Sequence, residues 1–123
     1  CMETRAFKAG ERIFERGACG DELFLIRRGS VRIELPLDAT RNHHIATFGR
    51  GAFFGEMTFL DGDARSANAI AATDADLYVL SRQTFDKLAE EHKKVALKLF
   101  EGIASVLAGR LRFANAEMRA LES

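Results

Sequence analysis

Short apolar runs separated by glycine fill residues 4–81, and a helical pattern follows them to the end of the chain. The separating glycines are Gly10, Gly17, Gly20, Gly29, Gly49, Gly51, Gly55 and Gly62. Brief apolar segments bounded by such turn residues are typical of a small antiparallel barrel or jelly roll. We therefore expect a mainly β fold, a β-roll (double-stranded β-helix or jelly roll), followed by a short helix and a long C-terminal helix.

Three of the expected strands can be placed from their patterns. Apolar and polar side chains alternate over 31–37, which predicts a strand with one dry and one wet face. Pro36 donates no ladder hydrogen bond, so this strand should lie near an edge or end there. Residues 23–26 are apolar without alternation, which predicts a strand covered on both sides. Residues 38–42 should form a hairpin tip that leads into a strand over 44–48.

Beyond Ser81 the apolar period becomes helical. Ser81 is predicted to cap a short helix over 83–91, and a long helix should run from about Lys94 to the end of the chain. Its apolar residues follow one another at alternating spacings of three and four, the pattern of a coiled-coil seam. The seam residues are Leu97, Phe100, Ala104, Leu107, Leu111, Ala114, Met118 and Leu121. We expect the seam to form a homodimer; the alternative is one wide apolar face buried within its own domain.

The 123 residues suffice for one structural domain, in which we expect a β-roll over 1–92 and the long helix over 93–123. Eighteen basic and eighteen acidic residues cancel, so no overall electric field draws the chain to nucleic acid or to an anionic membrane. We expect this chain to make no direct contact with nucleic acid and not to insert into a membrane. An anionic ligand must therefore be held by a local pocket.

Cysteine usage indicates the compartment. Cys1 and Cys19 are too few for a four-cysteine metal site or a disulfide framework, and no secretory signal precedes the first strand. We expect a reduced, cytoplasmic protein, or the cytoplasmic part of a larger one. A chain that begins Cys1-Met2 could be cut from something longer.

The sequence offers little for catalysis or metal binding. His43 and His44 are adjacent, so on a strand they point to opposite faces and cannot chelate one metal ion together. Glu56, Asp61 and Asp63 could form a carboxylate cluster, but Arg65 close by opposes a cation. No hydrolase, zinc-protease or P-loop motif occurs. We expect no enzyme activity, no metal and no cofactor.

The segment 53–68 carries the most chemical information. Gly55 stands after a strand and before a possible helical turn, where free N–H groups attract a phosphate and no side chain blocks its approach. Arg65 can supply a guanidinium fork to the phosphate oxygens, with the Ser66 hydroxyl and the Ala67 N–H beside it. The alternative for Arg65 is a surface ion pair with Asp61 or Asp63.

Glu56 is unexpected beside a phosphate, because a carboxylate only accepts hydrogen bonds. It could receive the proton of a sugar hydroxyl close to the phosphate, which requires a compact ligand such as a cyclic nucleotide. The alternative is a carboxylate that complements the positive end of a helix dipole.

The motifs taken together resemble the cyclic nucleotide-binding domain family, which includes catabolite-activator-like regulators and the regulatory subunits of cyclic-AMP-dependent kinase. The resemblance rests on the glycine-punctuated run from Gly10 to Val31 and on two motifs, Phe54-Gly55-Glu56-Met57 and Arg65-Ser66-Ala67. It implies that Glu56 binds the ribose 2′ hydroxyl, that Arg65 binds the cyclic phosphate, and that these residues belong to a phosphate-binding cassette. The other residues that it implies around the ligand are Gly55, Met57, Ser66 and Ala67.

Some features of the ligand and the output stay open. Arg112 and Asn115 on the long helix are candidates to cap the base, and they could equally be solvated positions. Ser66 does not decide between cyclic AMP and cyclic GMP; on the resemblance we expect cyclic AMP. The resemblance further implies a regulatory module that signals through its C-terminal helix to an effector upstream or in trans. The alternative is a dimerisation module of the same fold that binds no nucleotide.

Overall fold

The computed structural model describes the backbone of residues 3–37 and 41–122, and the side chains of the same residues except Asp61, Leu111 and 113–122. The chain falls into two compact units, Cys1–Thr84 and Phe85–Ser123. The first unit holds all the strands and the second holds most of the helical residues.

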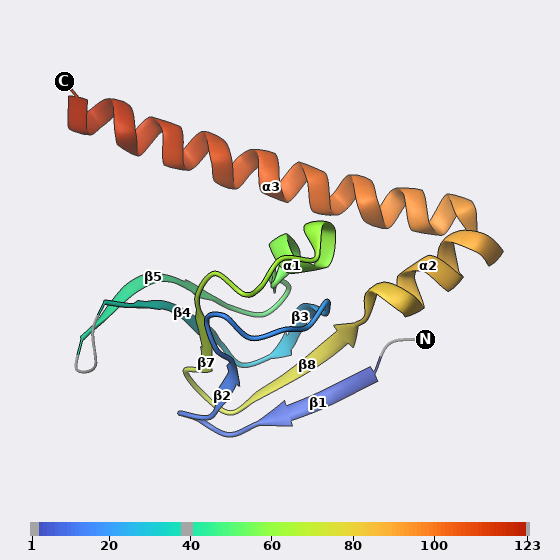
Figure 1. The fold of residues 1–123 in the computed structure, drawn as a ribbon, viewed down its shortest axis with the longest axis horizontal. Helices are drawn as coiled ribbons and strands as arrows, with labels where there is room; N and C mark the ends of the chain where they lie inside the picture. The colour runs from blue at the N-terminus through green and yellow to red at the C-terminus, as the bar shows by residue number, and fades with distance from the viewer. Residues whose placement is uncertain (1–2, 38–40, 123) are drawn as a thin grey trace. The chain divides into compact units, whose positions relative to one another are not determined.

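Two four-stranded antiparallel sheets form the first unit (Figure 1). The strand order is β1-β8-β3-β6 in one sheet and β2-β7-β4-β5 in the other. The strands are β1 (Glu3–Phe7), β2 (Arg12–Phe14), β3 (Leu23–Arg28), β4 (Val31–Pro36), β5 (Asn42–Phe48), β6 (Phe53–Phe54), β7 (Asn68–Ala71) and β8 (Ala75–Leu80). This arrangement confirms the predicted mainly β jelly roll.

The predicted dry and wet faces over 31–37 are wrong: only Val31 of β4 is buried, residues 32–36 are half-buried, and Leu37 lies beyond the strand and is 58% exposed. Arg32 and Glu34 pair at 3.1 Å on the face predicted to be wet, which leaves Glu34 only 13% exposed.

Other features of single strands follow the sequence pattern. β4 ends at Pro36, and its last two residues pair with β5 alone, as expected for a residue without an N–H donor. In β3, Leu23, Phe24 and Ile26 are buried, in agreement with a strand covered on both sides. β4 and β5 form the predicted hairpin, although residues 38–40 of its tip lie outside the described residues.

Three phenylalanine rings meet in the core. The Phe24 and Phe54 rings stack with centroids 5.1 Å apart, and the Phe14 ring lies 5.9 Å from Phe24 and 6.0 Å from Phe54. Phe24 and Phe54 are nearly inaccessible to water. Because β2, β3 and β6 each contribute one ring, the aromatic cluster joins strands of both sheets.

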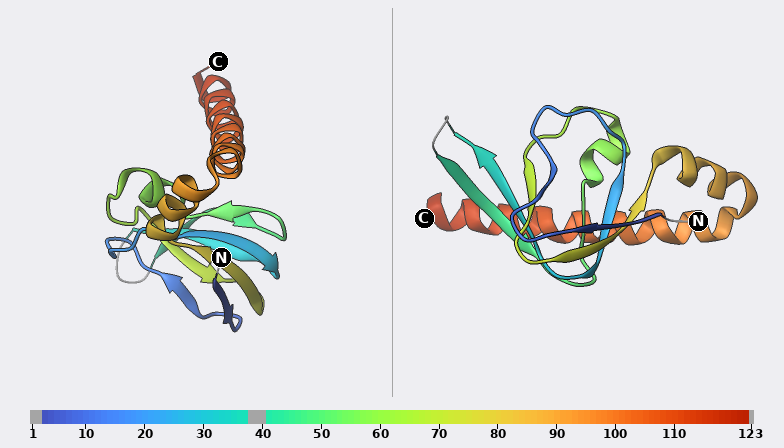
Figure 2. Two further views of the ribbon diagram at one scale, coloured as in Figure 1. Left: turned by 90° about the vertical axis from the view of Figure 1, so that its right-hand side faces the viewer. Right: turned by 90° about the horizontal axis from the view of Figure 1, so that it is seen from below.

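A short helix, α1 (Glu56–Asp61), follows β6 and contacts β3 (Figure 2). Gly62 ends it in the left-handed conformation, with a φ of 75°, and its N–H donates to the Thr58 carbonyl over 2.8 Å. The predicted helical turn within residues 53–68 is therefore present.

Two helices follow the strands. α2 (Arg82–Glu91) begins one residue before the predicted start, and the Ser81 hydroxyl accepts the Thr84 N–H over 3.1 Å as its N-cap. α3 (Lys93–Glu122) is the predicted long helix, and within the second unit the Phe85 and Phe100 rings lie 6.5 Å apart. No helix within the described ranges combines the length and hydropathy needed to cross a membrane.

Candidate functional site

The loop that contains Arg65 is attached to the loop before β3 by backbone hydrogen bonds. The Arg65 N–H donates to the Ala18 carbonyl over 3.1 Å, and the Gly17 N–H donates to the Arg65 carbonyl over 2.7 Å. Three residues further on, at the start of β7, the buried Asn68 side chain accepts the Arg16 N–H over 2.7 Å. These bonds fix the backbone from which the Arg65 side chain projects.

The Arg65 side chain enters the protein. The residue is 4% exposed, and its Nη1 and Nη2 groups donate to the carbonyls of Gly55 (3.0 Å) and Glu22 (2.8 Å). Its guanidinium carbon lies 4.4 Å from the centroid of the Phe14 ring, a cation–π contact. A surface ion pair, the alternative for this residue, does not fit such burial.

Burial and the nearby carboxylates act on the pKa of Arg65 in opposite directions. Burial lowers the pKa of its guanidinium, and the carboxylates of Glu22, Asp21 and Glu56, in that order, act in the opposite direction. Since an arginine in a protein keeps its proton, the site holds a permanent positive charge at the edge of the aromatic cluster. A permanent buried cation of this kind can pair with an anionic ligand.

Gly55 makes the position of this cation possible. Its φ is 80°, a conformation that glycine adopts at little cost. A Cβ atom on it would stand 2.8 Å from Arg65 Nη1 and 3.0 Å from the Glu22 carbonyl oxygen. The sequence suggested that Gly55 admits a phosphate; in the structure the group that approaches it is the Arg65 guanidinium.

The remaining predicted site residues differ in accessibility. Glu56, the first residue of α1, is half-buried, and Met57 beside it is 58% exposed. Ser66 is exposed and Ala67 is buried. The cassette thus brings Gly55 and Arg65 into contact and places Glu56 where its charge acts on Arg65.

The two candidates for base capping lie in the second unit. Arg112 is exposed on α3, and the Asn115 side chain lies outside the described residues.

Sequence reasoning missed two residues that contact Arg65, Phe14 and Glu22, and a third, Arg5, that pairs with Glu22. Phe14 and Glu22 contact Arg65, and the Glu22 carboxylate is paired with Arg5 Nη2 at 2.8 Å. The Glu22 contact uses a backbone carbonyl, which every residue type possesses, so no side-chain signal marks it. Arg5 lies on β1, far from the cassette in sequence, and only strand pairing brings it close.

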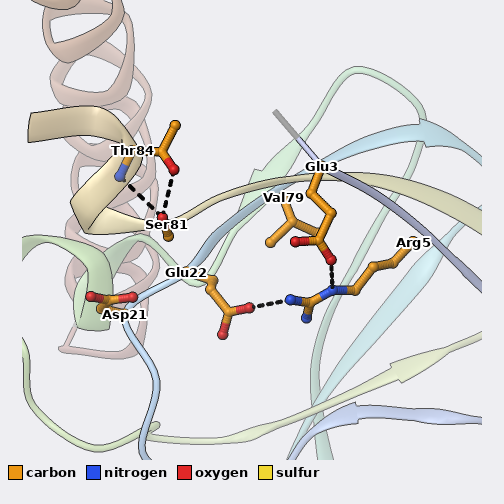
Figure 3. A pocket seen from close by; sticks show the side chains of 7 residues that line it. All are labelled: Glu3, Arg5, Asp21, Glu22, Val79, Ser81 and Thr84. Carbon is orange, nitrogen blue, oxygen red and sulfur yellow. Dashed lines mark hydrogen bonds and ion pairs between the residues drawn. The ribbon is translucent and has the colours of Figure 1, made fainter. Parts of the chain in front are cut away.

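Two hollows flank the segment before β3. One, of about 480 Å³, is lined by Cys19, Gly20, Asp21, Gly62 and Ala64, and therefore lies between this segment and the loop that precedes Arg65. The other, of about 230 Å³, contains the Arg5–Glu22 pair (Figure 3). Its lining residues are Glu3, Arg5, Asp21, Glu22, Val79, Ser81 and Thr84.

Comparisons with known proteins identify the family of this fold. The model of the cyclic nucleotide-binding domain family matches residues 4–92. A crystal structure of a cyclic nucleotide-binding domain from Methylobacillus flagellatus superposes with a TM-score of 0.84 at 32% identity, over 90% of this chain and 62% of that one.

Two curated relatives are longer than this chain. The cyclic AMP receptor protein of Thermus thermophilus is 34% identical over 95% of this chain and 52% of its own length. Glutaminase 1 of Bradyrhizobium diazoefficiens is 34% identical over 97% of this chain and 19% of its own length. The chain thus spans about half of the first relative and about a fifth of the second.

The fold, the Gly55–Arg65 cassette and the family match over residues 4–92 point to the same conclusion. This chain belongs to the cyclic nucleotide-binding domain family, of the type present in the cyclic AMP receptor protein.

Proposed function

We propose that this chain is a sensor that binds a cyclic nucleotide and passes the binding on through its C-terminal helix. The observation that carries the proposal is the buried Arg65 guanidinium, 3.0 Å from the Gly55 carbonyl just before α1. A fixed guanidinium suits a cyclic phosphodiester, because its N–H groups can meet two phosphate oxygens at once.

The present bonds of Arg65 leave room for such a ligand. A guanidinium has five N–H donors, and the bonds to Gly55 and Glu22 use two of them. In the proposed complex the phosphate meets the remaining donors or replaces the two carbonyls, and Glu56 accepts the ribose 2′ hydroxyl. Gly55, Met57, Ser66 and Ala67 surround the ligand.

Replacing the carbonyl bonds would move the cassette, and this is the basis of the proposed switch. A ligand shifts an equilibrium between two arrangements only through its different affinity for them. The arrangement with Arg65 on the two carbonyls would be the ligand-free one. The long helix α3 would carry the change to an effector elsewhere in the same protein or in trans.

We propose cyclic AMP as the ligand, with cyclic GMP as its closest competitor. The support is the likeness to the cyclic AMP receptor protein of Thermus thermophilus over 95% of this chain. Ser66 presents a hydroxyl that does not discriminate between the two bases. Arg112 and Asn115 are the proposed caps of the base.

We further propose a homodimer through the seam of α3, in a cytoplasmic protein. Among the described seam residues, Leu97 is 59% and Phe100 is 43% exposed, so apolar surface remains available for a second copy. Cytoplasmic location is supported by Cys19, which is a free, exposed thiol.

Titration calorimetry with cyclic AMP and cyclic GMP tests the ligand assignment. The parent chain should bind cyclic AMP, and Arg65→Gln should weaken binding about a hundredfold, close to 3 kcal/mol, because the phosphate loses its charged partner. Arg28→Gln is the matched control, because the Arg28 side chain is 74% exposed on β3 and should leave affinity unchanged.

Because Arg65 is buried, its replacement can also affect folding. Circular dichroism must show that Arg65→Gln is folded, and Arg65→Lys, which keeps the charge, should fall between the parent and Arg65→Gln. Unchanged affinity in a folded Arg65→Gln would overturn the site. Absence of binding by the parent to either nucleotide would favour the dimerisation module without a ligand.

A further inference from the structure

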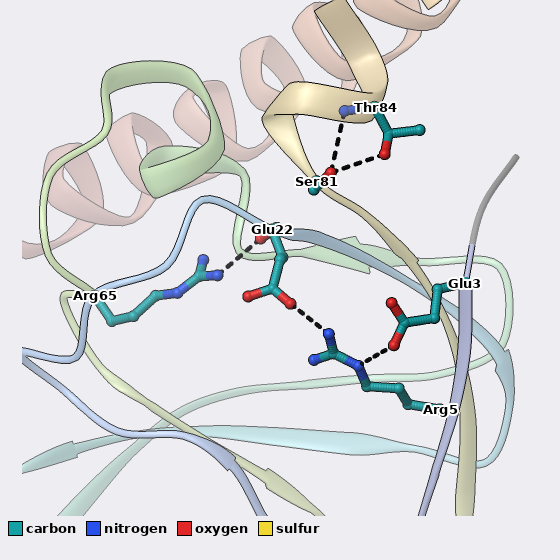
Figure 4. A network of polar contacts seen from close by, with 6 residues as sticks. All are labelled: Glu3, Arg5, Glu22, Arg65, Ser81 and Thr84. Carbon is teal, nitrogen blue, oxygen red and sulfur yellow. Dashed lines mark hydrogen bonds and ion pairs between the residues drawn. The ribbon is translucent and has the colours of Figure 1, made fainter. Parts of the chain in front are cut away.

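The Glu22 carboxylate lies between two arginine side chains (Figure 4). On one side its Oε2 atom pairs with Arg5 Nη2 at 2.8 Å. On the other side is the Arg65 guanidinium, whose Nη2 donates to the backbone carbonyl of the same Glu22 over 2.8 Å. One acidic residue therefore contacts Arg65 through its backbone and Arg5 through its side chain.

The second carboxylate oxygen of Glu22 faces the same small space as Arg65. A Cβ atom on Gly20 would lie 3.3 Å from Glu22 Oε1 and 3.8 Å from Arg65 Nη2. Residue 20 itself adds no side chain to this space, because it is glycine. Of the carboxylates that raise the pKa of Arg65 against its burial, Glu22 has the largest effect.

Arg5 is itself fixed on the far side of the carboxylate. Its Nε donates to Glu3 Oε1 over 2.8 Å, and its Nη2 meets Glu22, so both ends of the guanidinium are engaged. The side chains of Arg5 and Glu22 are 39% and 25% exposed, which means that solvent only partly screens their attraction. Arg5 on β1 thus engages the Oε2 atom of Glu22 from the side opposite Arg65 (Figure 4).

This arrangement matters for an anionic ligand. A carboxylate and a phosphate present the same kind of acceptor oxygens to a guanidinium. A carboxylate that can reach Arg65 therefore competes with the phosphate for its N–H donors and repels the ligand's charge. An arginine that pairs with this carboxylate reduces both effects.

We propose that Glu22 is an internal anion that opposes phosphate binding at Arg65, and that Arg5 is the positioning residue that holds it back. The proposal rests on the proposed function, in which Arg65 binds the phosphate. It makes β1, which supplies no residue of the cassette, a determinant of nucleotide affinity.

The proposal predicts effects of opposite sign for the two partners of one ion pair. Glu22→Gln removes the charge but keeps the backbone carbonyl and the side-chain shape, so cyclic AMP should bind about three- to tenfold more tightly. Arg5→Gln releases the carboxylate toward Arg65, so binding should weaken by about the same factor. The double variant should bind like Glu22→Gln, because without the carboxylate Arg5 has nothing to restrain.

Calorimetry of the full chain with cyclic AMP measures these effects, with thermal unfolding recorded in parallel. Arg32→Gln and Glu34→Gln are the matched controls: this pair also joins an arginine to a glutamate on one side of a β-roll sheet, at 3.1 Å and with 41% and 13% exposure. Neither control should change affinity. Arg5→Lys, which keeps the positive charge, should restore most of the affinity lost in Arg5→Gln.

A purely structural role for the Arg5–Glu22 pair gives a different result. Both single variants would then weaken binding and lower the unfolding temperature together, and that outcome would overturn the proposal. Unchanged affinity in Glu22→Gln would also overturn it. If Arg65→Gln binds as tightly as the parent in the same series, the proposed function itself has failed, which separates the two failures.

Salt provides an independent readout. Because the competition is between charges that solvent partly reaches, the difference between the parent and Glu22→Gln should shrink as ionic strength rises from about 0.01 M to about 1 M. A difference independent of salt would indicate a change of shape instead of charge, and would contradict the proposal.

Discussion

Gly55 and Arg65 depend on each other at the scale of single residues. Arg65 can donate to the Gly55 carbonyl only because no Cβ atom occupies the space beside its Nη1 group. Gly55 in turn has a φ of 80°, which lets the chain turn from β6 directly into α1. A side chain at position 55 therefore disturbs the backbone conformation and the position of the cation together.

Gly55→Ala should be much more destabilising than an ordinary glycine replacement. The left-handed conformation alone costs about 1–2 kcal/mol for alanine. The new methyl group would also meet Arg65 Nη1 at 2.8 Å and the Glu22 carbonyl oxygen at 3.0 Å, so the site must shift. We expect a total loss of about 3 kcal/mol in the free energy of unfolding by urea denaturation, together with loss of nucleotide binding.

Gly51→Ala separates the two contributions. Gly51 also has a positive φ, 87°, but a Cβ atom on it would meet nothing within 4 Å. Gly51→Ala should lower the free energy of unfolding only by the conformational contribution, about 1–2 kcal/mol, and should retain nucleotide affinity. Equal losses in the two variants would show that the contact between residues 55 and 65 is unimportant.

At the scale of elements, α1 is stabilised by contacts from outside the helix. With six residues it has few internal hydrogen bonds, and its last carbonyls need other donors. Gly62 supplies one, and Arg82 at the start of α2 supplies another through its Nη1 group, 3.1 Å from the Phe59 carbonyl oxygen. The Arg82 guanidinium carbon also lies 5.5 Å from the centroid of the Phe59 ring. A cation at a helix C-terminus is favourable, and α1 has no basic residue of its own there.

Arg82→Met should loosen the cassette helix while leaving the sheets intact. The shorter methionine keeps an unbranched apolar stem but loses the charge-assisted hydrogen bond, so we expect a cost of about 1–2 kcal/mol in unfolding free energy. The methyl resonance of Met57, in α1, should shift in a methionine-labelled NMR spectrum. Arg82→Lys should show a smaller change, and Arg27→Met, which alters an exposed arginine stacked on Tyr78, should leave the Met57 signal in place. An unmoved Met57 signal in Arg82→Met would contradict the proposed support.

At the scale of the whole molecule, the two units differ in how far their apolar side chains are buried. The unit over 1–84 has a core in which aromatic side chains of both sheets meet. In the unit over 85–123, α3 exposes apolar side chains at Leu97 and Phe100. Exposed apolar residues at heptad spacing favour pairing with a second helix.

Leu97→Glu should convert the proposed dimer into a monomer. Because Leu97 is 59% exposed, the change removes little packing within the chain, but it places a charge in the seam. Sedimentation equilibrium measures the mass, and calorimetry should show nucleotide affinity within about twofold of the parent. Lys98→Glu, an exposed neighbour on the same helix but outside the seam, should remain dimeric. A dimer that survives Leu97→Glu would exclude the seam as the interface.

Periodic and local features could be predicted from the sequence alone. The end of β4 at Pro36, the Ser81 cap and the change to a helical period each depend on neighbours in the chain. The cassette motif was recognisable for the same reason, because Gly55, Glu56 and Arg65 lie within one short segment. Physical rules that act over a few residues leave a readable pattern in the sequence.

The surroundings of Arg65 were decided only by the tertiary structure. Its partners are the carbonyls of Gly55 and Glu22 and the Phe14 ring, and a backbone carbonyl leaves no mark on residue type. Arg5 approaches Glu22 because β1 and β3 both pair with β8, a long-range arrangement that no local spacing encodes. The sequence thus determined that a cation belongs to the cassette, and folding determined which carbonyls bind it and which arginine pairs with Glu22 beside it.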